Sequence, residues 1–510
     1  MKKLKPLFLL PLFVLSVIDS FAQTNGVYNI KDFGAVGDGV TLDSKAINKT
    51  IDEVASKGGG DIIFPAGNYL SGAIHLKSNI HLILQQGCVL IATDENPEQN
   101  YDSAETSINT TYQDYGHSHF HNTFIWGDSL HNISITGPGM IWGKGLIRDW
   151  IKNDRHANKA ICLYRCRNVI IRDVSILHGG WFAILATGVD NLTIDNLKID
   201  TERDGIDIDC CKGVRVINCF VNSPHDDGIC LKSTFALGYF KPTENVTITN
   251  CQVSGYVEGS LLDGTFKKTE NPEDNFKPTG RIKFGTESNG GFKNITISNC
   301  VFDYCRGLAL ETVDGGLLED VTINNITMRD IVNDPIFLRL GSRMRAPQGT
   351  AVGKLHRVII SNVIVYNADS NYACTISGVP GNNIEDVQLN NISIYYKGGI
   401  TTFNHDTIPE KENAYPEPGM FGRASSSGFF IRHVRGLKLN NITIKHFAAD
   451  KRPAFILNDA QNIYMKEIDV DTETRQPWAI LKNVKEFHVS DSYDLKDANM
   501  SNGVNETLYK

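Results

Sequence analysis

The chain has 510 residues, of which 41% are hydrophobic and 21% are charged. This composition supplies enough apolar side chain for a large core and excludes long disordered stretches. The formal net charge of −8 argues against nucleic acid as a partner, although a locally basic site can still bind an acidic sugar.

The first 22 residues predict a cleaved secretory signal peptide. Three lysines precede an apolar stretch at residues 6–18 that is too short to anchor the chain in a membrane. Small residues at Ser20 and Ala22 place the cleavage before Gln23. No later segment is apolar enough for a membrane helix. We therefore expect an exported protein, periplasmic or extracellular, with no membrane partner.

The N-terminal part of the mature chain differs from the rest. Residues Ser44–Lys57 have the apolar spacing of an amphipathic helix, and Asp61–Phe64 and Ile80–Ile91 alternate like strands. The helix can cover the open end of a stack of strands, where backbone groups would otherwise be unpaired. We assign 23–510 to a single domain in which residues 27–92 form this capping segment.

From residue 168 onward one pattern recurs: apolar residues alternate, a polar pair with Asn or Asp follows, and the alternation resumes. Successive repeats begin at Asn168, Asn191 and Gly213, which are 23 and 22 residues apart. Alternation predicts strands with one buried face, and Asn marks a turn because it tolerates the left-handed conformation. Repeats of this length predict a solenoid, here an all-β, right-handed parallel β-helix with a ladder of stacked Asn side chains.

A β-sandwich or propeller is the alternative fold. It would need Asn-Gly or Asp-Gly hairpin turns between antiparallel strands, and these are sparse in the chain. The polar stretches Thr93–His121, Gly255–Pro278 and Phe403–Ser427 are expected to be loops on one rim, where binding residues usually gather.

Eleven cysteines in an exported protein could indicate disulfides or a metal site. However, Cys219, Cys251 and Cys300 each follow an Asn in the repeat, at a slot that elsewhere holds Ile or Val. We therefore expect free thiols packed in the core, and neither a metal nor a cofactor.

Two acidic runs, Asp204-Gly205-Ile206-Asp207 and Asp226-Asp227-Gly228-Ile229, lie 22 residues apart. If one repeat is one coil, Asp204 is stacked beside the Asp226–Asp227 pair. Crowded carboxylates raise the pKa of at least one of them, and a protonated carboxyl beside an ionised one is an acid–base pair. Strand alternation would point these residues inward, so we place them at the turn before each strand. The alternative is a turn-capping role, which we prefer for Asp207 and Asp209.

These residues carry a resemblance to glycoside hydrolase family 28, the polygalacturonases and rhamnogalacturonan hydrolases. The likeness covers nearly all of the mature chain. The family's Asn-Thr-Asp-Gly motif falls on Glu202-Arg203-Asp204-Gly205, and its Asp-Asp motif falls on Asp226-Asp227. Further matches are Gly58-Gly59-Gly60, Phe64-Pro65-Ala66-Gly67, Leu76-Lys77-Ser78-Asn79 and Gly137-Pro138-Gly139.

The resemblance implies catalytic roles for three residues. Asp226 would be the general acid, and Asp204 and Asp227 would position and deprotonate the attacking water, with inversion at the anomeric carbon. Hydrolysis of a glycosidic bond requires these two activities, a proton for the leaving oxygen and an activated water.

Two family motifs are altered. The Gly-His-Gly segment falls on Thr279-Gly280-Arg281, and the Arg-Ile-Lys motif falls on Ala309-Leu310-Glu311. The lost cations would bind the substrate carboxylate, so their absence argues against ordinary endo-cleavage of polygalacturonate. Rhamnogalacturonan hydrolases resemble the chain in this departure. The candidate substrate-binding residues, some of which could instead be solvated surface charges, are His225, Lys232, Arg281, Lys283, Glu287, Glu311 and Arg339.

Three functions remain open at this point. The first is a monomeric hydrolase that cleaves galacturonic acid linkages in pectic polysaccharide or oligosaccharide, with exo action if the loops close one end of the site; rhamnogalacturonan hydrolysis is its close alternative. The second is a Ca²⁺-dependent polysaccharide lyase with a basic proton acceptor. The third is a β-helix that binds polysaccharide without catalysis.

Overall fold

The computed structural model describes residues 26–94, 100–106, 109–147, 158–269, 277–404, 408–472 and 476–510. The signal peptide predicted for residues 1–22 lies outside these ranges. Within them, the structure contains no helix with the length and apolar character that a membrane crossing requires.

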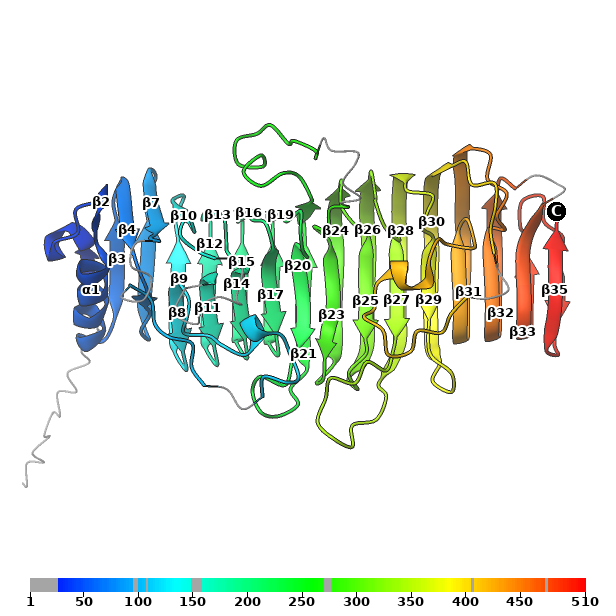
Figure 1. The fold of residues 1–510 in the computed structure, drawn as a ribbon, viewed down its shortest axis with the longest axis horizontal. Helices are drawn as coiled ribbons and strands as arrows, with labels where there is room; N and C mark the ends of the chain where they lie inside the picture. Colours follow the sequence, from blue (N-terminus) through cyan, green and yellow to red (C-terminus); the bar gives the residue numbers. More distant parts are fainter. Residues whose placement is uncertain are drawn as a thin grey trace, which may run out of the picture.

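The chain winds into a long stack of coils along one axis (Figure 1). One coil consists of β17 (Asp204–Asp209), β18 (Lys212–Ile217) and β19 (Phe220–Asn222). Each of these strands pairs in parallel with its counterpart in the coil before and in the coil after. This arrangement confirms the right-handed parallel β-helix and excludes the sandwich and the propeller.

The N-terminal segment covers the first coil. The α-helix α1 (Ser44–Ser56) buries Ile47, Ile51 and Val54 at the end of the core, which confirms the predicted helix. The predicted strand Ile80–Ile91 is instead two strands, because Gly87 turns the chain with a φ of +79°. The other elements of this part are β1 (Gly26–Asn29), η1 (Ile30–Phe33), β2 (Asp38–Leu42), β3 (Gly60–Phe64), β4 (Gly67–Ser71), β5 (Ile74–His75), β6 (Ile80–Leu84), β7 (Cys88–Ala92), η2 (Tyr115–His117), β8 (Ile125–Asp128), β9 (His131–Thr136) and β10 (Met140–Trp142).

The later coils continue the same winding, and their second and third strands fuse into longer ones. At the C-terminal end, β33 (Pro477–Ser490) pairs in antiparallel with β34 (Ala498–Met500) and β35 (Val504–Tyr509), which covers the last edge. The remaining elements are β11 (Lys159–Tyr164), β12 (Arg167–Arg172), β13 (Ser175–Leu177), β14 (Phe182–Thr187), β15 (Asp190–Asp195), β16 (Lys198–Asp200), β20 (Ile229–Ser233), β21 (Thr243–Thr249), β22 (Gln252–Ser254), β23 (Ile282–Ser288), β24 (Phe292–Asp303), β25 (Leu308–Thr312), β26 (Leu317–Arg329), β27 (Ile336–Leu340), β28 (Lys354–Ala368), β29 (Cys374–Ser377), β30 (Ile384–Gly398), η3 (Pro418–Phe421), β31 (Phe429–Ala448) and β32 (Phe455–Val470).

The predicted asparagine ladder is present at the turn between the second and third strands of the coils. Each amide nitrogen donates to the side-chain oxygen of the preceding rung over 2.9 to 3.3 Å. Every rung has a φ between +54° and +57°, the left-handed conformation for which Asn is suited. The rungs are Asn218, Asn250, Asn299, Asn325, Asn362, Asn391 and Asn441.

The cysteines are core residues, as predicted. All eleven are buried free thiols. Cys219, Cys251 and Cys300 follow rungs of the ladder and pack in the main apolar core. Burial holds the pKa of the Cys88 thiol up at about 12, so such groups pack as small apolar side chains.

The three predicted loops all connect the third strand of one coil to the first strand of the next, so they leave the solenoid at a common turn. Asp226 and Asp227 lie in that same turn, between β19 and β20. Residues 408–427 cross in front of β25, β27 and β29, and residues 255–269 extend away from the stack (Figure 1).

Candidate active site

The first strands of successive coils form a face that is aliphatic inside and charged outside. In β20, Ile229 and Leu231 point into the core while Lys232 points outward. In β23 and β25 the same alternation turns Lys283 and Glu311 outward. The charged side of these strands is nonetheless buried, because loops lie over it, so its charges interact strongly with one another.

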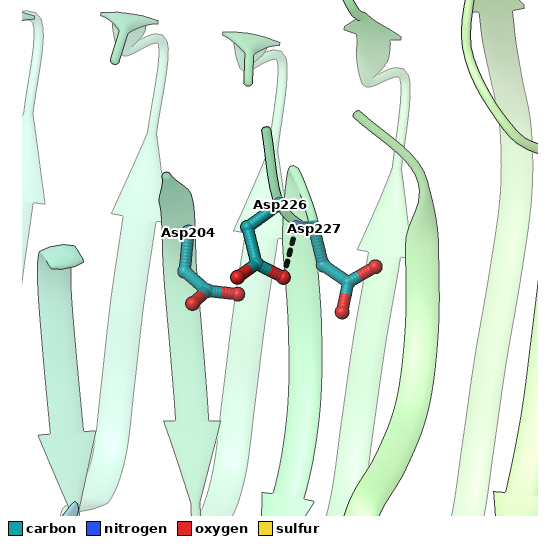
Figure 2. A group of neighbouring side chains, drawn as sticks. All are labelled: Asp204, Asp226 and Asp227. Atoms are coloured by element: carbon teal, nitrogen blue, oxygen red, sulfur yellow. Dashed lines mark hydrogen bonds between the residues drawn. The ribbon is translucent and has the colours of Figure 1, made fainter. Parts of the chain in front are cut away.

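Asp204, Asp226 and Asp227 meet on this face, as Figure 2 shows. Each carboxylate places one oxygen within 4.8 Å of the other two. Asp227 lies in the turn before β20, as expected, and its backbone N–H donates to Asp226 over 3.0 Å. Asp204 is the first residue of β17 and aligns with Phe182, which belongs to an outer cluster instead of the main core. At this strand end the alternation therefore does not turn Asp204 inward.

Two glycines allow the coils to approach at this point. The N–H of Gly205 donates to the carbonyl of Asp227 over 3.0 Å. A Cβ on Gly205 would lie 2.5 Å from the carbonyl oxygen of Gly228, closer than real side chains come to a neighbouring backbone. The Asp-Gly steps of the sequence thus combine a carboxylate with the small residue that brings it beside the next coil.

Asp227 is a buried anion held by two cations. Arg281 Nε donates to its Oδ1 over 2.9 Å, and Lys283 Nζ lies 3.3 Å from its Oδ2. The three side chains are about equally inaccessible, at 2% exposed. Burial alone would raise the pKa of Asp227, but Lys283 and Arg281 outweigh it and hold that pKa well below its usual range. Asp227 is therefore ionised.

Asp204 has the opposite environment. Burial raises the pKa of Asp204 well above its usual range, and the charge of Asp226 raises it further. Its Oδ1 has no hydrogen-bond partner among the described residues. Asp204 therefore holds a proton close to the ionised Asp227, which is the pairing that the two acidic runs predicted.

Asp226 is the most accessible of the three, with 28% of its side chain exposed. Its Oδ2 accepts from Arg203, through Nε at 3.1 Å and through a still shorter contact to Nη2. The guanidinium of Arg203 stacks on Trp181, with its central carbon 4.4 Å from the ring. Trp181 itself is only 5% exposed. It therefore packs against the buried side of Arg203 and does not present a ring face on which a sugar could stack.

A second charged group surrounds Glu287. Lys232 Nζ lies 3.5 Å from Glu287, and the guanidinium groups of Arg343 and Arg345 lie 3.5 and 3.4 Å from it. Burial would raise the pKa of Glu287, but Lys232 and Arg343 outweigh it and hold that pKa well below its usual range. Lys232 and Glu287 thus neutralise each other in the free protein.

Asp207 corrects one sequence interpretation. It is not a turn cap, because it lies inside β17 on the outward side and is fully buried, and neither of its oxygens has a hydrogen-bond partner in the part of the chain that the structure describes. His117 from η2 faces it at 3.3 Å. Asp209 does have the structural role expected of it, since it accepts from the backbone N–H of Thr234 over 2.8 Å and so fixes the loop after β20.

The remaining predicted binding residues lie in different surroundings. Glu311 is fully buried, 3.7 Å from Lys283, and burial raises its pKa to about 7. Arg339 is also buried, and its guanidinium donates to backbone carbonyls, including those of Glu410 and Lys411. Arg339 thus anchors the 408–427 loop. His225 is one-third exposed, with Nδ1 3.5 Å from Glu202.

The 408–427 loop brings two residues that the sequence did not single out. Glu417 pairs with Arg281 in a short contact and with Arg306 at 3.0 Å. Tyr415 is 55% exposed, and its hydroxyl accepts from Lys283 over 3.3 Å. The charges of Asp226 and Asp227 also act on this hydroxyl. No repeat places these residues, so only the position of the loop at the aspartate turn could have indicated them.

Known proteins share sequence and fold with this chain. Residues 27–260 match the family model described as rhamnogalacturonase A/epimerase, pectate lyase-like. A protein named "Probable polygalacturonase" from Vitis vinifera is 25% identical over 331 residues, 59% of this chain and 60% of its own length. An exo-poly-alpha-D-galacturonosidase from Dickeya chrysanthemi is 28% identical over 282 residues, 54% of this chain and 40% of its own length. The chain thus spans less than two thirds of either relative.

Among solved structures, the family 28 exopolygalacturonase of Yersinia enterocolitica superposes with a TM-score of 0.64. The superposition covers 88% of this chain and 79% of that one at 19% identity, which supports the fold. The segment that matches the family model, residues 27–260, includes the Asp204 and Asp226–Asp227 motifs. These matches support the resemblance to glycoside hydrolase family 28 that the motifs carry.

Proposed function

We propose that the protein is an exported glycoside hydrolase that cleaves glycosidic bonds to galacturonic acid in pectin. The observation that carries the proposal is the meeting of Asp204, Asp226 and Asp227 on adjacent coils, with an ionised and a protonated carboxyl among them. Asp226, the most accessible, donates the proton to the leaving oxygen. Asp204 and Asp227 hold and deprotonate the water that attacks with inversion.

The acid and the water-binding residues exchange protons as one unit. Asp204 and Asp226 interact closely enough that the proton belongs to the pair. In the free protein Asp204 holds it, whereas the reaction needs it on Asp226. Transfer across this short distance requires no backbone movement, because oxygens of the two carboxylates already lie within 4.8 Å of each other.

Exo action is supported by an apolar cluster that covers the site on the side nearest the N-terminal coils. The outward side chains of β11 and β14 are covered there by an apolar cluster. It includes Phe120 from the segment after η2 and Ala236 from the loop after β20, packed on Trp181 and Phe182. A polysaccharide cannot continue past Asp204 through this cluster, so a chain end is the substrate that fits.

The calcium-dependent lyase is less favoured because the carboxylate oxygens already have cationic partners. Arg281 and Lys283 occupy both oxygens of Asp227, and Arg203 occupies one oxygen of Asp226. A calcium ion would need these oxygens as ligands. Rhamnogalacturonan hydrolysis remains a second candidate, favoured by Glu311 in place of a basic motif residue and by the name of the matched family model.

The test compares wild type with Asp226→Asn on polygalacturonate and on rhamnogalacturonan. Loss of a general acid lowers the rate by about 10²- to 10⁴-fold, while the thermal transition should be unchanged. Wild type should release monosaccharide from polygalacturonate without a product that absorbs in the ultraviolet, and a chelator should not slow it. Activity on rhamnogalacturonan alone would select the second candidate, and full activity in Asp226→Asn would remove Asp226 as the acid.

A further inference from the structure

Arg203 differs from the two cations that hold Asp227 in its accessibility and in its partners. Its side chain is 20% exposed, whereas Arg281 and Lys283 are 2% exposed. Arg281 is shared among Asp227, Glu311 and Glu417, so its position is fixed from several sides. Arg203 instead holds Asp226, with Asp204 farther off at 3.8 Å.

The contact between Arg203 and Asp226 opposes the proposed reaction. A guanidinium on a carboxylate favours the ionised form, but a general acid must carry a proton. Without Arg203, Asp226 would face mainly acidic groups. The charged and titratable groups that interact with it are Asp204, Asp207, Asp227 and Tyr415. Asp114 acts on Arg203, and Lys232 acts on Asp204.

The substrate brings a group that can exchange for Asp226. Each galacturonate unit carries a carboxylate, and the planar fork of an arginine binds any carboxylate in the same two-pronged manner. Exchange of one carboxylate for another costs little, because the number of ion pairs stays constant. Trp181 lies under the guanidinium and can support it in either position through the stacked contact at 4.4 Å.

We propose that Arg203 is a substrate-operated latch: it pairs with Asp226 in the free enzyme and moves to the carboxylate of a bound galacturonate. This inference rests on the proposed function of Asp226 as the acid. Once Arg203 has moved away, the Asp204–Asp226 pair takes up one further proton from solvent, and Asp226 gives a proton to the leaving oxygen. The latch also supplies a cation for the substrate carboxylate, where the family's Arg-Ile-Lys motif is replaced by Ala309-Leu310-Glu311.

Proton uptake on binding tests the latch without any turnover. Galacturonate and the neutral sugar galactose are titrated calorimetrically into the protein, in two buffers of different ionisation enthalpy at one pH. Wild type should take up protons with galacturonate, up to about one per sugar bound, and none with galactose. Arg203→Thr, which restores the family's residue, should bind galacturonate more weakly and take up no proton.

Three controls separate the latch from a structural role of Arg203. Arg215→Thr removes an exposed arginine on another face and should behave as wild type. Asp226→Asn should lose the proton uptake, and Arg203→Lys should retain part of it because the charge remains. Equal uptake in wild type and Arg203→Thr would overturn the latch, as would persistence of uptake in Asp226→Asn or no binding of galacturonate to wild type.

Kinetics distinguish failure of the latch from failure of the proposed function. In wild type the alkaline limb of kcat, which reports the complex, should lie at higher pH than that of kcat/KM, which reports the free enzyme. In Arg203→Thr the two limbs should coincide. If the alkaline limbs of kcat and kcat/KM coincide in a wild type that is active, the latch is wrong and the proposed hydrolase function still stands. Absence of hydrolysis with Arg203-dependent proton uptake would overturn the proposed hydrolase and leave the carboxylate latch standing.

Discussion

The turn that carries Asn218 and the turn that carries Asp226 belong to the same coil, and both present polar side chains to the coils beside them. At the first turn the same residue type recurs, and each amide bonds to the equivalent amide of the preceding rung. At the second turn the residue type is not constant. Asp204, Asp226 and Arg281 come from three successive passes of the chain through this turn and form one cluster of unlike charges.

The difference shows how one architecture separates stability from chemistry. The ladder spreads its stabilisation over many neutral, exposed bonds, so each rung contributes little. The aspartate turn concentrates charge in a buried region, where an unpaired group is costly and where pKa values shift. Changes at the aspartate turn should therefore be larger and pH-dependent, and changes in the ladder smaller and insensitive to pH.

The largest loss of stability should follow Arg281→Met. This change leaves Asp227 and Glu417 without their buried guanidinium partner, and removal of one member of a buried ion pair costs about 3 to 5 kcal/mol. The matched control is Arg215→Met, an exposed arginine bonded to Asn191 and Thr193, which should cost no more than about 0.5 kcal/mol. Denaturant unfolding at pH 7 measures both.

The pH dependence of that loss provides a further check. In Arg281→Met the carboxyl of Asp227 has lost a cation, so the folded variant binds a proton more readily than wild type does. The deficit should be full at pH 7 and should shrink as pH falls and the carboxyls take up protons. A deficit that is equal at pH 4 and pH 7 would show that packing, and not charge, is what Arg281 supplies.

The ladder should respond more mildly, and two substitutions separate its contributions. Asn325→Ala loses the amide bonds to Asn299 and Asn362 and places a Cβ-bearing residue without a compensating bond at a φ of +55°. Asn325→Gly loses the same bonds but adopts this φ freely. We expect about 2 to 3 kcal/mol for Ala and about 1 kcal/mol for Gly. Equal costs would mean that the left-handed turn is not what selects Asn here.

Hydrolysis should be unaffected in both ladder variants at temperatures where they are folded. The rung lies at a different turn from Asp226, and its neighbours are other rungs. A drop in kcat in Asn325→Gly would break the separation of stability from chemistry that the two turns suggest.

The same contrast explains what the sequence could predict. The ladder, the core slot of Cys251 and the stacking of Asp204 beside Asp226 all follow from a repeat of constant length, so counting residues places them. The capping helix follows from its own apolar spacing. The turn within Ile80–Ile91 was missed because alternation continues through it and only Gly87 marks the break.

The partners of the aspartates could not be predicted in this way. Arg281 immediately precedes β23 and Lys283 lies within it, but their contact with Asp227 depends on a long insertion between β22 and β23. Arg339 has the position of a ligand-binding arginine, yet it anchors a loop that follows much later in the chain. Tyr415 reaches the site on that loop. Such contacts arise from tertiary packing and leave no periodic signal.

Glu311→Gln should have a smaller effect that grows with pH. Burial raises the pKa of Glu311 to about 7 in the folded protein, above its usual value. The folded state therefore binds a proton that the unfolded state has released, and wild type loses stability as pH rises through that window. The variant lacks this loss, so from pH 5 to pH 8 it should gain on the order of 1 kcal/mol relative to wild type.

The ladder again supplies the control for this measurement. Asn325→Gly contains no new or lost titratable group, so its deficit should be the same at pH 5 and pH 8. If Glu311→Gln and Asn325→Gly have parallel stability profiles, Glu311 is ionised throughout and Lys283 outweighs its burial.

The smallest effect expected is on substrate affinity, through Tyr415. Its ring is 55% exposed beside Asp226 and Asp227, and Lys283 lies 5.4 Å from the ring centre, so one face of the ring is held in place. A stacked sugar would gain about 1 kcal/mol from this surface, so Tyr415→Ala should raise KM roughly fivefold with little change in kcat. Tyr415→Phe keeps the ring and should stay within about twofold of wild type. If Phe is as impaired as Ala, the hydroxyl bond to Lys283 is the important contact, and Tyr415 belongs to the charged cluster and not to the sugar-binding surface.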